Sequence, residues 1–310
     1  MCSFKDSFLS GLLLISFLFL VNSSMAQLYP VSSQYIYHGI VINPAESGKD
    51  GALSMSLGYR NQWLGFEGSP KTISASVHAP LGNDKVGLGL LILSDSYGII
   101  SHTNFRGNYA YRIEMGNGIL AFGLSASIIR MDVSPSKLIA EDPDDDFLNS
   151  LAESTTQPNF GAGVYYRARN YFVGFSVPQL LAENRSISSV SNNSISDHSG
   201  YSYFGYGGYQ IRFHPHFSFE PSMLVRYFKG NALQFDITPQ LGISDKIWIG
   251  ANYRTEGAMT ALLRCKIDHQ ISLGYSYDFE IGNKQRYLNN SHEIMLKYIL
   301  KYKTQVVSPR

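Results

Sequence analysis

The chain of 310 residues is poor in charge: 16% of its residues are charged, 44% are hydrophobic, and the formal net charge is +1. A typical soluble domain carries about 25% charged residues. The apolar content excludes a disordered chain, and the balanced charge excludes a nucleic-acid binder that relies on a basic surface. Low charge combined with 21 Tyr, 18 Phe and 28 Gly favours β structure, either a soluble sandwich or a membrane barrel.

Residues 1–26 predict a secretory signal peptide. Lys5 precedes the apolar run Phe8–Val21. Ser24-Met25-Ala26 then places small residues at the two positions that a signal peptidase recognises, which predicts cleavage after Ala26. The apolar run is shorter than the ~20 residues of a membrane-spanning helix, which favours a signal over an anchor. Cleavage removes Cys2 and leaves Cys265 as the remaining cysteine, so the mature chain has no intramolecular disulfide.

Apolar and polar residues alternate along most of the mature chain. In residues 51–60, Leu53, Leu57 and Tyr59 fall on one face, whereas serine, glycine and arginine fall on the other. The same alternation recurs in 72–80, 232–238 and 270–280. A period of two predicts strands with one apolar and one polar face. No later segment is long and apolar enough for a membrane helix, so a membrane-inserted mature chain would be a barrel.

The alternating runs predict about fourteen antiparallel strands, an even number as in bacterial outer-membrane barrels. The predicted strands span 51–61, 70–80, 85–94, 98–114, 118–133, 157–167, 170–178, 200–213, 217–229, 232–243, 247–254, 257–267, 270–280 and 291–302.

The connections between these strands alternate in length. Short ones occupy 81–84, 115–117, 168–169, 214–216, 244–246 and 268–269, and longer ones occupy 134–156, 179–200 and 281–290. Short periplasmic turns and longer outer loops are typical of outer-membrane barrels. Alternation alone also fits a soluble sandwich, but this sorting of loops favours an all-β, transmembrane outer-membrane barrel located in the cell outer membrane.

The predicted organisation has four parts: a signal peptide at 1–26, an N-terminal segment at 27–50, the barrel at 51–302 and a C-terminal tail at 303–310. Residues 28–50 lack alternation. They either plug the lumen of the barrel or hang into the periplasm.

Several short motifs occur in a fixed order along the chain. They are Ser33–His38 (SQYIYH), Asn43–Gly48 (NPAESG), Arg60–Trp63 (RNQW), Gly68–Thr72 (GSPKT), Tyr109–Tyr111 (YAY) and His292–Tyr298 (HEIMLKY). Together they resemble the PorP/SprF family of type IX secretion system membrane proteins from Bacteroidota. The resemblance covers essentially the whole mature chain.

This resemblance implies an outer-membrane barrel that works with the type IX export and gliding machinery. The implied partners are the periplasmic PorK/PorN lipoprotein ring, a PorE-like peptidoglycan-binding lipoprotein and possibly an exported adhesin. Outer-membrane lipid would surround the barrel, and no nucleic acid or cofactor is expected. Which of these docking roles the chain plays stays open.

Two groups of residues are candidates for partner binding: Asn43 and Pro44, and the first hairpin with Arg60, Gln62, Trp63, Pro70 and Lys71. Proline fixes its own backbone and extends the preceding residue, so Asn43-Pro44 is either a rigid bend into the barrel or a fixed epitope. In the hairpin, Trp63 is either an interfacial anchor or part of a docking surface, and Arg60 is either a lumen charge or part of that surface.

The motifs of common enzymes are missing from the sequence. It has no Gly-x-Ser-x-Gly elbow and no glycine-rich phosphate loop, so we predict no catalytic, cofactor or metal site. The acidic run at 141–146 offers calcium ligands but lacks the glycine and closing glutamate of a helix-loop-helix calcium site, so a solvated loop is favoured. Two rivals remain: a channel for hydrophobic small molecules with an N-terminal hatch, and a barrel phospholipase.

Overall fold

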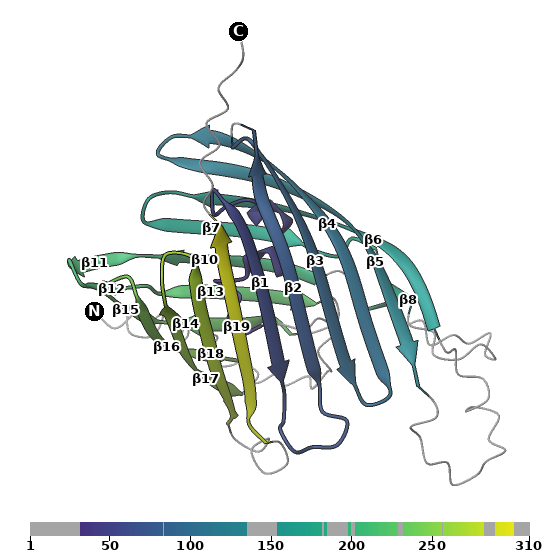
Figure 1. Ribbon diagram of the computed structural model, residues 1–310. Helices are drawn as coiled ribbons and strands as arrows, with labels where there is room; N and C mark the ends of the chain where they lie inside the picture. The colour runs from purple at the N-terminus through teal and green to yellow at the C-terminus, as the bar shows by residue number, and fades with distance from the viewer. Residues whose placement is uncertain are drawn as a thin grey trace, which may run out of the picture.

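The computed structural model is all-β and describes residues 32–82, 84–134, 154–181, 183–184, 198–199, 202–228, 232–255, 257–281 and 289–300. Within these residues, fourteen antiparallel positions close into a barrel. Strand β1 (Leu53–Asn61) pairs with β2 (Lys71–Leu81) on one side and with β19 (Ser291–Leu300) on the other (Figure 1). The first and last strands therefore seal the wall.

The rest of the wall follows chain order. It consists of β3 (Val86–Tyr97), β4 (Ile100–Met115), β5 (Gly118–Val133), β6 (Ser154–Arg167), β7 (Tyr171–Val177), β10 (Ser202–Tyr209), β13 (Ser222–Phe228), β14 (Gln234–Thr238), β16 (Ile247–Arg254), β17 (Ala258–Lys266) and β18 (Ile271–Glu280). Strands β11 (Ile211–His214), β12 (Phe217–Phe219) and β15 (Gln240–Ile243) continue the positions of β10, β13 and β14, and β8 (Glu183–Asn184) pairs with β9 (His198–Ser199) outside the wall. The predicted barrel of fourteen strands is confirmed.

Three predicted strands are interrupted rather than continuous. The spans 200–213, 217–229 and 232–243 break at Gln210, at Glu220-Pro221 and at Pro239. Proline lacks the N–H that a strand ladder needs, which accounts for the second and third breaks. The Gln210 side chain donates to the Glu220 carboxylate (2.8 Å), so the first break lies beside the second.

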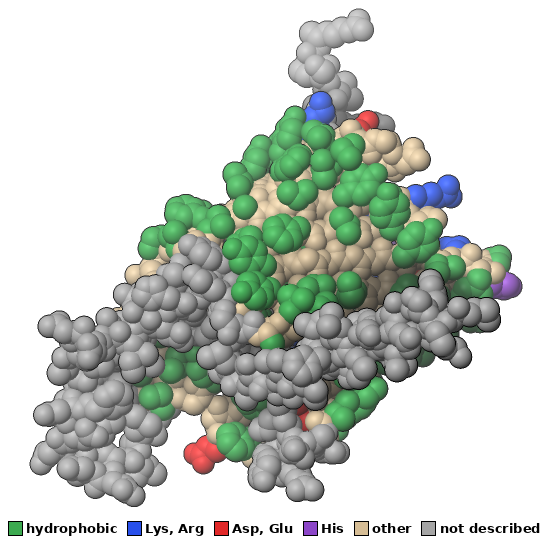
Figure 2. Space-filling model, turned by 180° about the vertical axis from the view of Figure 1, so that it is seen from behind, with side chains coloured by type: hydrophobic (Ala, Val, Ile, Leu, Met, Phe, Trp, Pro, Cys, Tyr) green, Lys and Arg blue, Asp and Glu red, His purple; other side chains and the backbone are tan. Residues whose placement is uncertain are grey.

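The apolar face of the wall points outward. Leu90 and Leu124 are each 63% exposed, whereas Ser54 and Ser276 are fully buried on the inside. In a soluble sandwich the apolar face would form the core, so this arrangement excludes that alternative and fits a wall that faces lipid. Figure 2 shows hydrophobic side chains spread over the described part of the outer surface. No helix within the described residues is long and apolar enough to cross a membrane.

The two ends of the barrel differ. One end, here called the turn end, carries the connections 82–85, 116–117, 168–170, 215–216, 244–246 and 267–270. The other, the loop end, carries 62–70 and the longer connections, of which 135–153 and most of 179–200 lie outside the described residues. The connections predicted to be short all lie at the turn end, whereas the loop end carries connections of varied length, including the short one at 98–99.

The N-terminal segment, residues 32–50, lies inside the barrel. It forms two 3-10 turns, η1 (Gly39–Val41) and η2 (Pro44–Glu46), and η2 packs against β4, β5 and β6. The purple coil inside the ring of strands in Figure 1 is this segment. Most of its residues are fully buried, so it fills the bore instead of hanging below it. The predicted signal peptide at 1–26 and the tail at 303–310 lie outside the described residues.

Candidate functional site

The N-terminal segment spans the whole cross-section of the bore. It touches every one of the fourteen wall positions within the described residues. These contacts involve Arg60 (β1), Ser76 (β2), Gly89 (β3), Arg106 (β4), Gly123 (β5), Val164 (β6), Ser176 (β7), Tyr206 (β10), Ser222 (β13), Gln240 (β15), Arg254 (β16), Arg264 (β17), Asp278 (β18) and Glu293 (β19). Among the described residues, the segment therefore contacts the wall all the way around the lumen.

Asn43 and Pro44 lie at the middle of this packing. Asn43 is extended (φ −138°, ψ 116°), as expected before proline, and its side-chain oxygen accepts from the Ala45 N–H (2.9 Å) to cap η2. The Asn43 amide also donates to the backbone carbonyl of Val164 on β6 (3.0 Å). Both residues are buried, so a partner at either end of the barrel does not reach them in this arrangement.

A buried charge network holds the start of the segment near the loop end. Arg60 pairs with Asp278 and with Glu293 (3.1 Å), and all three side chains are almost completely buried. The Ser33 hydroxyl accepts from Arg60 (3.2 Å) and donates to Asp278 (3.1 Å). The Glu293 carboxylate also accepts from the Ser33 N–H (2.9 Å) and from the Ser32 hydroxyl. The first described residues of the segment thus complete an ion cluster of the wall.

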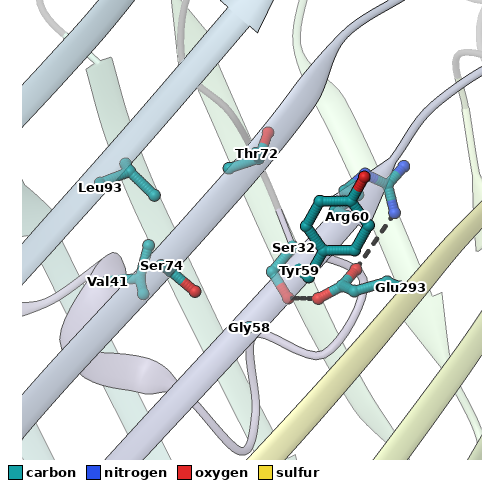
Figure 3. A pocket seen from close by; sticks show the side chains of 9 residues that line it. All are labelled: Ser32, Val41, Gly58, Tyr59, Arg60, Thr72, Ser74, Leu93 and Glu293. Carbon is teal, nitrogen blue, oxygen red and sulfur yellow. Dashed lines mark hydrogen bonds and ion pairs between the residues drawn. The ribbon is translucent and has the colours of Figure 1, made fainter.

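Figure 3 shows Arg60 from β1 and Ser32 from the segment, both joined to the Glu293 carboxylate on β19. These side chains line a small cavity with a volume of about 20 Å³, together with Val41, Gly58, Tyr59, Thr72, Ser74 and Leu93. Such a space accommodates about one water molecule. It is too small for an organic substrate.

The network continues around the wall through Asp236. Arg226 donates to Asp236 (2.7 Å) and Arg254 does so from the other side (3.3 Å). Arg254 also reaches the Ser33 hydroxyl (3.4 Å), which links this part to the first. Tyr35 of the segment lies against the same strands, and its burial raises the pKa of its hydroxyl to about 12. Alternating cations and anions compensate for the cost of burying each charge.

A second charge cluster holds the end of the segment near the turn end. Asp50 pairs with Lys297 on β19 (2.8 Å) and lies 3.6 Å from the His78 imidazole. Burial alone would raise the pKa of Asp50, but Lys297 and Lys49 hold it below its usual range. Burial would lower the pKa of Lys49, but its partner Glu46 raises it above its ordinary value. Both groups therefore remain charged in the bore at neutral pH.

Tyr37 anchors the segment against β15 and β17. The Arg264 guanidinium lies between two aromatic rings, 3.9 Å from the Tyr37 ring centre and 3.5 Å from that of Trp248. The Trp248 indole N–H donates to Glu220 (3.1 Å), where β12 and β13 are interrupted. A cation between two rings, beside a carboxylate, gives a favourable contact in a desolvated site.

The inner wall also carries an apolar patch, which the predicted polar inner face of the strands did not include. Wall residues Leu91, Leu93, Ala121, Tyr165, Phe204, Tyr206, Leu224 and Phe228 cluster with Tyr35, Val41, Ile42 and Ala45 of the segment. The segment covers this patch, so an apolar lining and a polar lining coexist in one bore.

The other sequence-predicted residues gather at the loop end. Gln62 and Trp63 lie in the β1–β2 connection, Pro70 closes it through the Gln62 N–H (2.9 Å), and Lys71 begins β2 with an exposed side chain. Trp63 adopts a left-handed backbone (φ 50°), and its indole N–H donates to Glu280 on β18 (3.2 Å). The structure thus brings these four residues together, but it places them apart from the buried Asn43 and Pro44.

The comparison with protein families decides the identity of this barrel. The family model described as type IX secretion system membrane protein PorP/SprF matches residues 24–298.

The chain belongs to the PorP/SprF family.

Solved structures place this PorP/SprF protein among outer-membrane barrels. A deletion mutant of TodX, described as a monoaromatic hydrocarbon channel, is similar with a TM-score of 0.52 and 9% identity, over 88% of this chain and 95% of that one. Omp33 of Acinetobacter baumannii is similar with a TM-score of 0.47 and 6% identity, over 81% of this chain and 99% of that one. At these identities the TodX likeness shows the fold alone. A search among curated proteins gives no significant match.

Family and fold together place the PorP/SprF protein in the outer membrane as a component of type IX secretion. Within its described residues no group of three or more His, Cys, Asp or Glu side chains is arranged to hold a metal ion. The acidic run at 141–146 lies outside those residues.

Removal of the Glu293 carboxylate should loosen the N-terminal segment. Glu293→Ala leaves Arg60 with one fewer buried counter-ion and the Ser33 N–H without its acceptor. The Arg60–Glu293 pair lies within the wall, so the opening equilibrium feels mainly the lost hydrogen bonds from Ser32 and Ser33 to the carboxylate. A hydrogen bond to a charged group contributes about 1.5–3 kcal/mol, so opening should become about tenfold or more favourable. Trypsin cleavage after Lys49 measures this opening, because Lys49 is ion-paired and largely buried in the docked segment. The control Asp245→Ala, in an exposed pair with Arg212, should leave the cleavage rate nearly unchanged.

Acid should also loosen the segment. Burial, reinforced by the nearby Lys297, His78 and Lys49, lowers the pKa of His38 from 6.5 to about 3. The docked state disfavours protonated His38. The stability of the docked state is therefore greatest above about pH 6.5 and falls as the pH decreases toward 3, with the docking equilibrium constant changing by at most tenfold per pH unit. Protonation of Asp50 acts mainly below its ordinary pKa of 3.8, at the acidic end of this range.

Hydrogen exchange of residues 32–50, corrected for the intrinsic effect of pH, measures this dependence. His38→Gln removes the titrating group and keeps a hydrogen-bonding side chain beside Ser76. This variant should show a flatter pH dependence between pH 6.5 and 4. An identical dependence in both proteins would show that another group controls the docking.

Proposed function

We propose that this PorP/SprF protein is a non-enzymatic docking component of the type IX secretion and gliding machinery. Its turn end binds periplasmic lipoproteins of the PorK/PorN ring or a PorE-like peptidoglycan binder, and its loop end holds an exported adhesin. The observation that carries the proposal is the occupied bore. A barrel whose lumen is filled across all fourteen wall positions offers partners its two ends and no passage.

The orientation follows from the connections. In outer-membrane barrels the short turns face the periplasm and the longer loops face the medium. The turn end of this barrel therefore faces the periplasmic lipoproteins, and the loop that contains Gln62, Trp63, Pro70 and Lys71 faces the exported protein. Hydrogen bonds hold this loop in one shape: Leu64 N–H donates to the Asn290 carbonyl (3.0 Å), and Gly98 N–H to the Gly68 carbonyl (2.8 Å). A preorganised loop loses little conformational entropy on binding.

The alternative function is a channel for hydrophobic small molecules with the N-terminal segment as its hatch. The buried apolar patch of the bore supports it, because such a patch could contact an apolar solute. The charge network against which Ser33 rests opposes it, because this network lines the route near the loop end. The docking function therefore fits the arrangement of charges better.

A pull-down of the tagged protein from its own outer membrane in mild detergent, followed by mass spectrometry, tests the proposal. Two exposed lysines at opposite ends, Lys71 at the loop end and Lys246 at the turn end, give matched variants. Lys71→Glu should reduce recovery of an exported protein and retain the lipoproteins, and Lys246→Glu should do the reverse. Electrostatic mismatch at a rim should weaken each partner several-fold.

Recovery of the barrel without partners would contradict the docking function. If the wild-type barrel is recovered alone while the rest of the type IX machinery is present in the same membrane, the docking function is wrong. Uptake of apolar solutes into liposomes would then test the channel.

A further inference from the structure

The wall of the bore binds the N-terminal segment partly through its main chain. Several lumen-facing side chains form hydrogen bonds with peptide groups of the segment, although the wall also binds its side chains. Four of these main-chain hydrogen bonds join Glu293 to the Ser33 N–H (2.9 Å), Arg106 to the Val41 carbonyl (3.1 Å), Ser176 to the Ile42 carbonyl (2.7 Å) and His78 to the Gly48 N–H (3.0 Å). Every polypeptide carries these groups, so this part of the recognition does not depend on the identity of the bound residue.

Glycines on the wall allow the main chain of the segment to approach closely. A Cβ atom at Gly123 on β5 would lie 2.5 Å from the Cα of Ala45, and one at Gly87 on β3 would lie 2.8 Å from the carbonyl carbon of Ser47. Real Cβ atoms essentially never approach other atoms this closely, so a side chain at either position would displace the segment. The wall is therefore shaped to a polypeptide backbone as well as bonded to it.

The joint between the segment and the wall lies at Gly51, beyond the last of these contacts at Gly48. Gly48 (φ +72°) and Gly51 (φ +65°) both adopt the left-handed backbone that favours glycine, and they flank the turn that leads into β1. Gly51 is exposed, and a Cβ built on it meets nothing within 4 Å. The chain at Gly51 therefore connects the segment to β1 without adding to the packing in the bore.

We propose that the bore is a binding site for a polypeptide segment, which residues 32–50 occupy in the resting protein and from which an external peptide can displace them. The joint at Gly51 lies at the turn end, so the segment withdraws toward that end and the exchanging peptide belongs to a protein on the same side. This source rests on the proposed docking function, whereas the peptide site itself rests on the contacts in the bore.

The experiment converts the segment into a separate ligand after folding. A protease site is inserted directly after Gly51 in the full chain, the purified barrel is cleaved in detergent, and a fluorescent peptide of residues 32–50 is added. The intact barrel should exclude the probe, and the cleaved barrel should exchange it for its own fragment with one peptide per barrel.

Wall variants test the main-chain recognition. Arg106→Ala in the cleaved barrel should weaken probe binding about tenfold or more, because a hydrogen bond from a charged donor to a buried carbonyl is lost. The matched control is Arg130→Ala on β5, whose side chain is exposed and paired with Asp132. It should bind the probe as the unmodified barrel does. Equal binding by both variants would overturn the assignment of the bore as the peptide site.

The remaining outcomes also decide the proposal. If the cleaved fragment never exchanges with the probe, or if cleavage unfolds the barrel as judged by heat-dependent gel mobility, the segment is a fixed part of the fold and the proposal is wrong. This assay needs no partner. Its failure would leave the docking function standing, and a failed pull-down would not affect the peptide exchange.

Discussion

The interaction on which the structure depends is the pairing of the polar lumen wall with the N-terminal segment. A barrel that presents leucine and phenylalanine to lipid must turn its serine, arginine and aspartate side chains inward. Buried charges and peptide groups without partners would cost several kcal/mol each. Residues 32–50 supply these partners: Ser33 joins Arg60 to Asp278, and the carbonyl of Val41 accepts from Arg106. The segment therefore acts as the core of the barrel.

The two charge clusters divide this task between the ends of the segment. Near the loop end, the wall supplies most of the charges, and the Ser33 hydroxyl connects them. Near the turn end, the segment itself supplies Asp50, Lys49 and Glu46. Asp50 pairs with Lys297 of the wall, and Lys49 pairs with Glu46. An apolar patch between the clusters buries Val41 and Ile42. Polar contacts fix the position of the segment, and the apolar patch buries additional nonpolar surface. Together these contacts account for the filled bore.

The sequence predicted the strands of the barrel wall far better than the position and contacts of the N-terminal segment. Strand spans such as 118–133 and 247–254 coincide with the observed β5 and β16, because alternation and turn residues are local signals. The segment has no such period, and its partners are distant: Ser33 and Glu293 are 260 residues apart. The apolar patch was missed because strands far apart in the sequence assemble it: each contributes at most two residues, such as Leu91 and Leu93 from β3 and Phe204 and Tyr206 from β10. Asn43-Pro44 predicted the local bend, which the extended Asn43 displays, but not where the bend lies.

Ion conductance in planar bilayers tests the closed bore most directly. The full-length protein, reconstituted at neutral pH, should give no steady conductance, because residues 32–50 reach all fourteen wall positions. The Glu293→Ala variant should show transient openings, because it weakens the hold on Ser33. A stable open conductance from the unmodified protein would contradict the account, since it would require a continuous aqueous path past the segment.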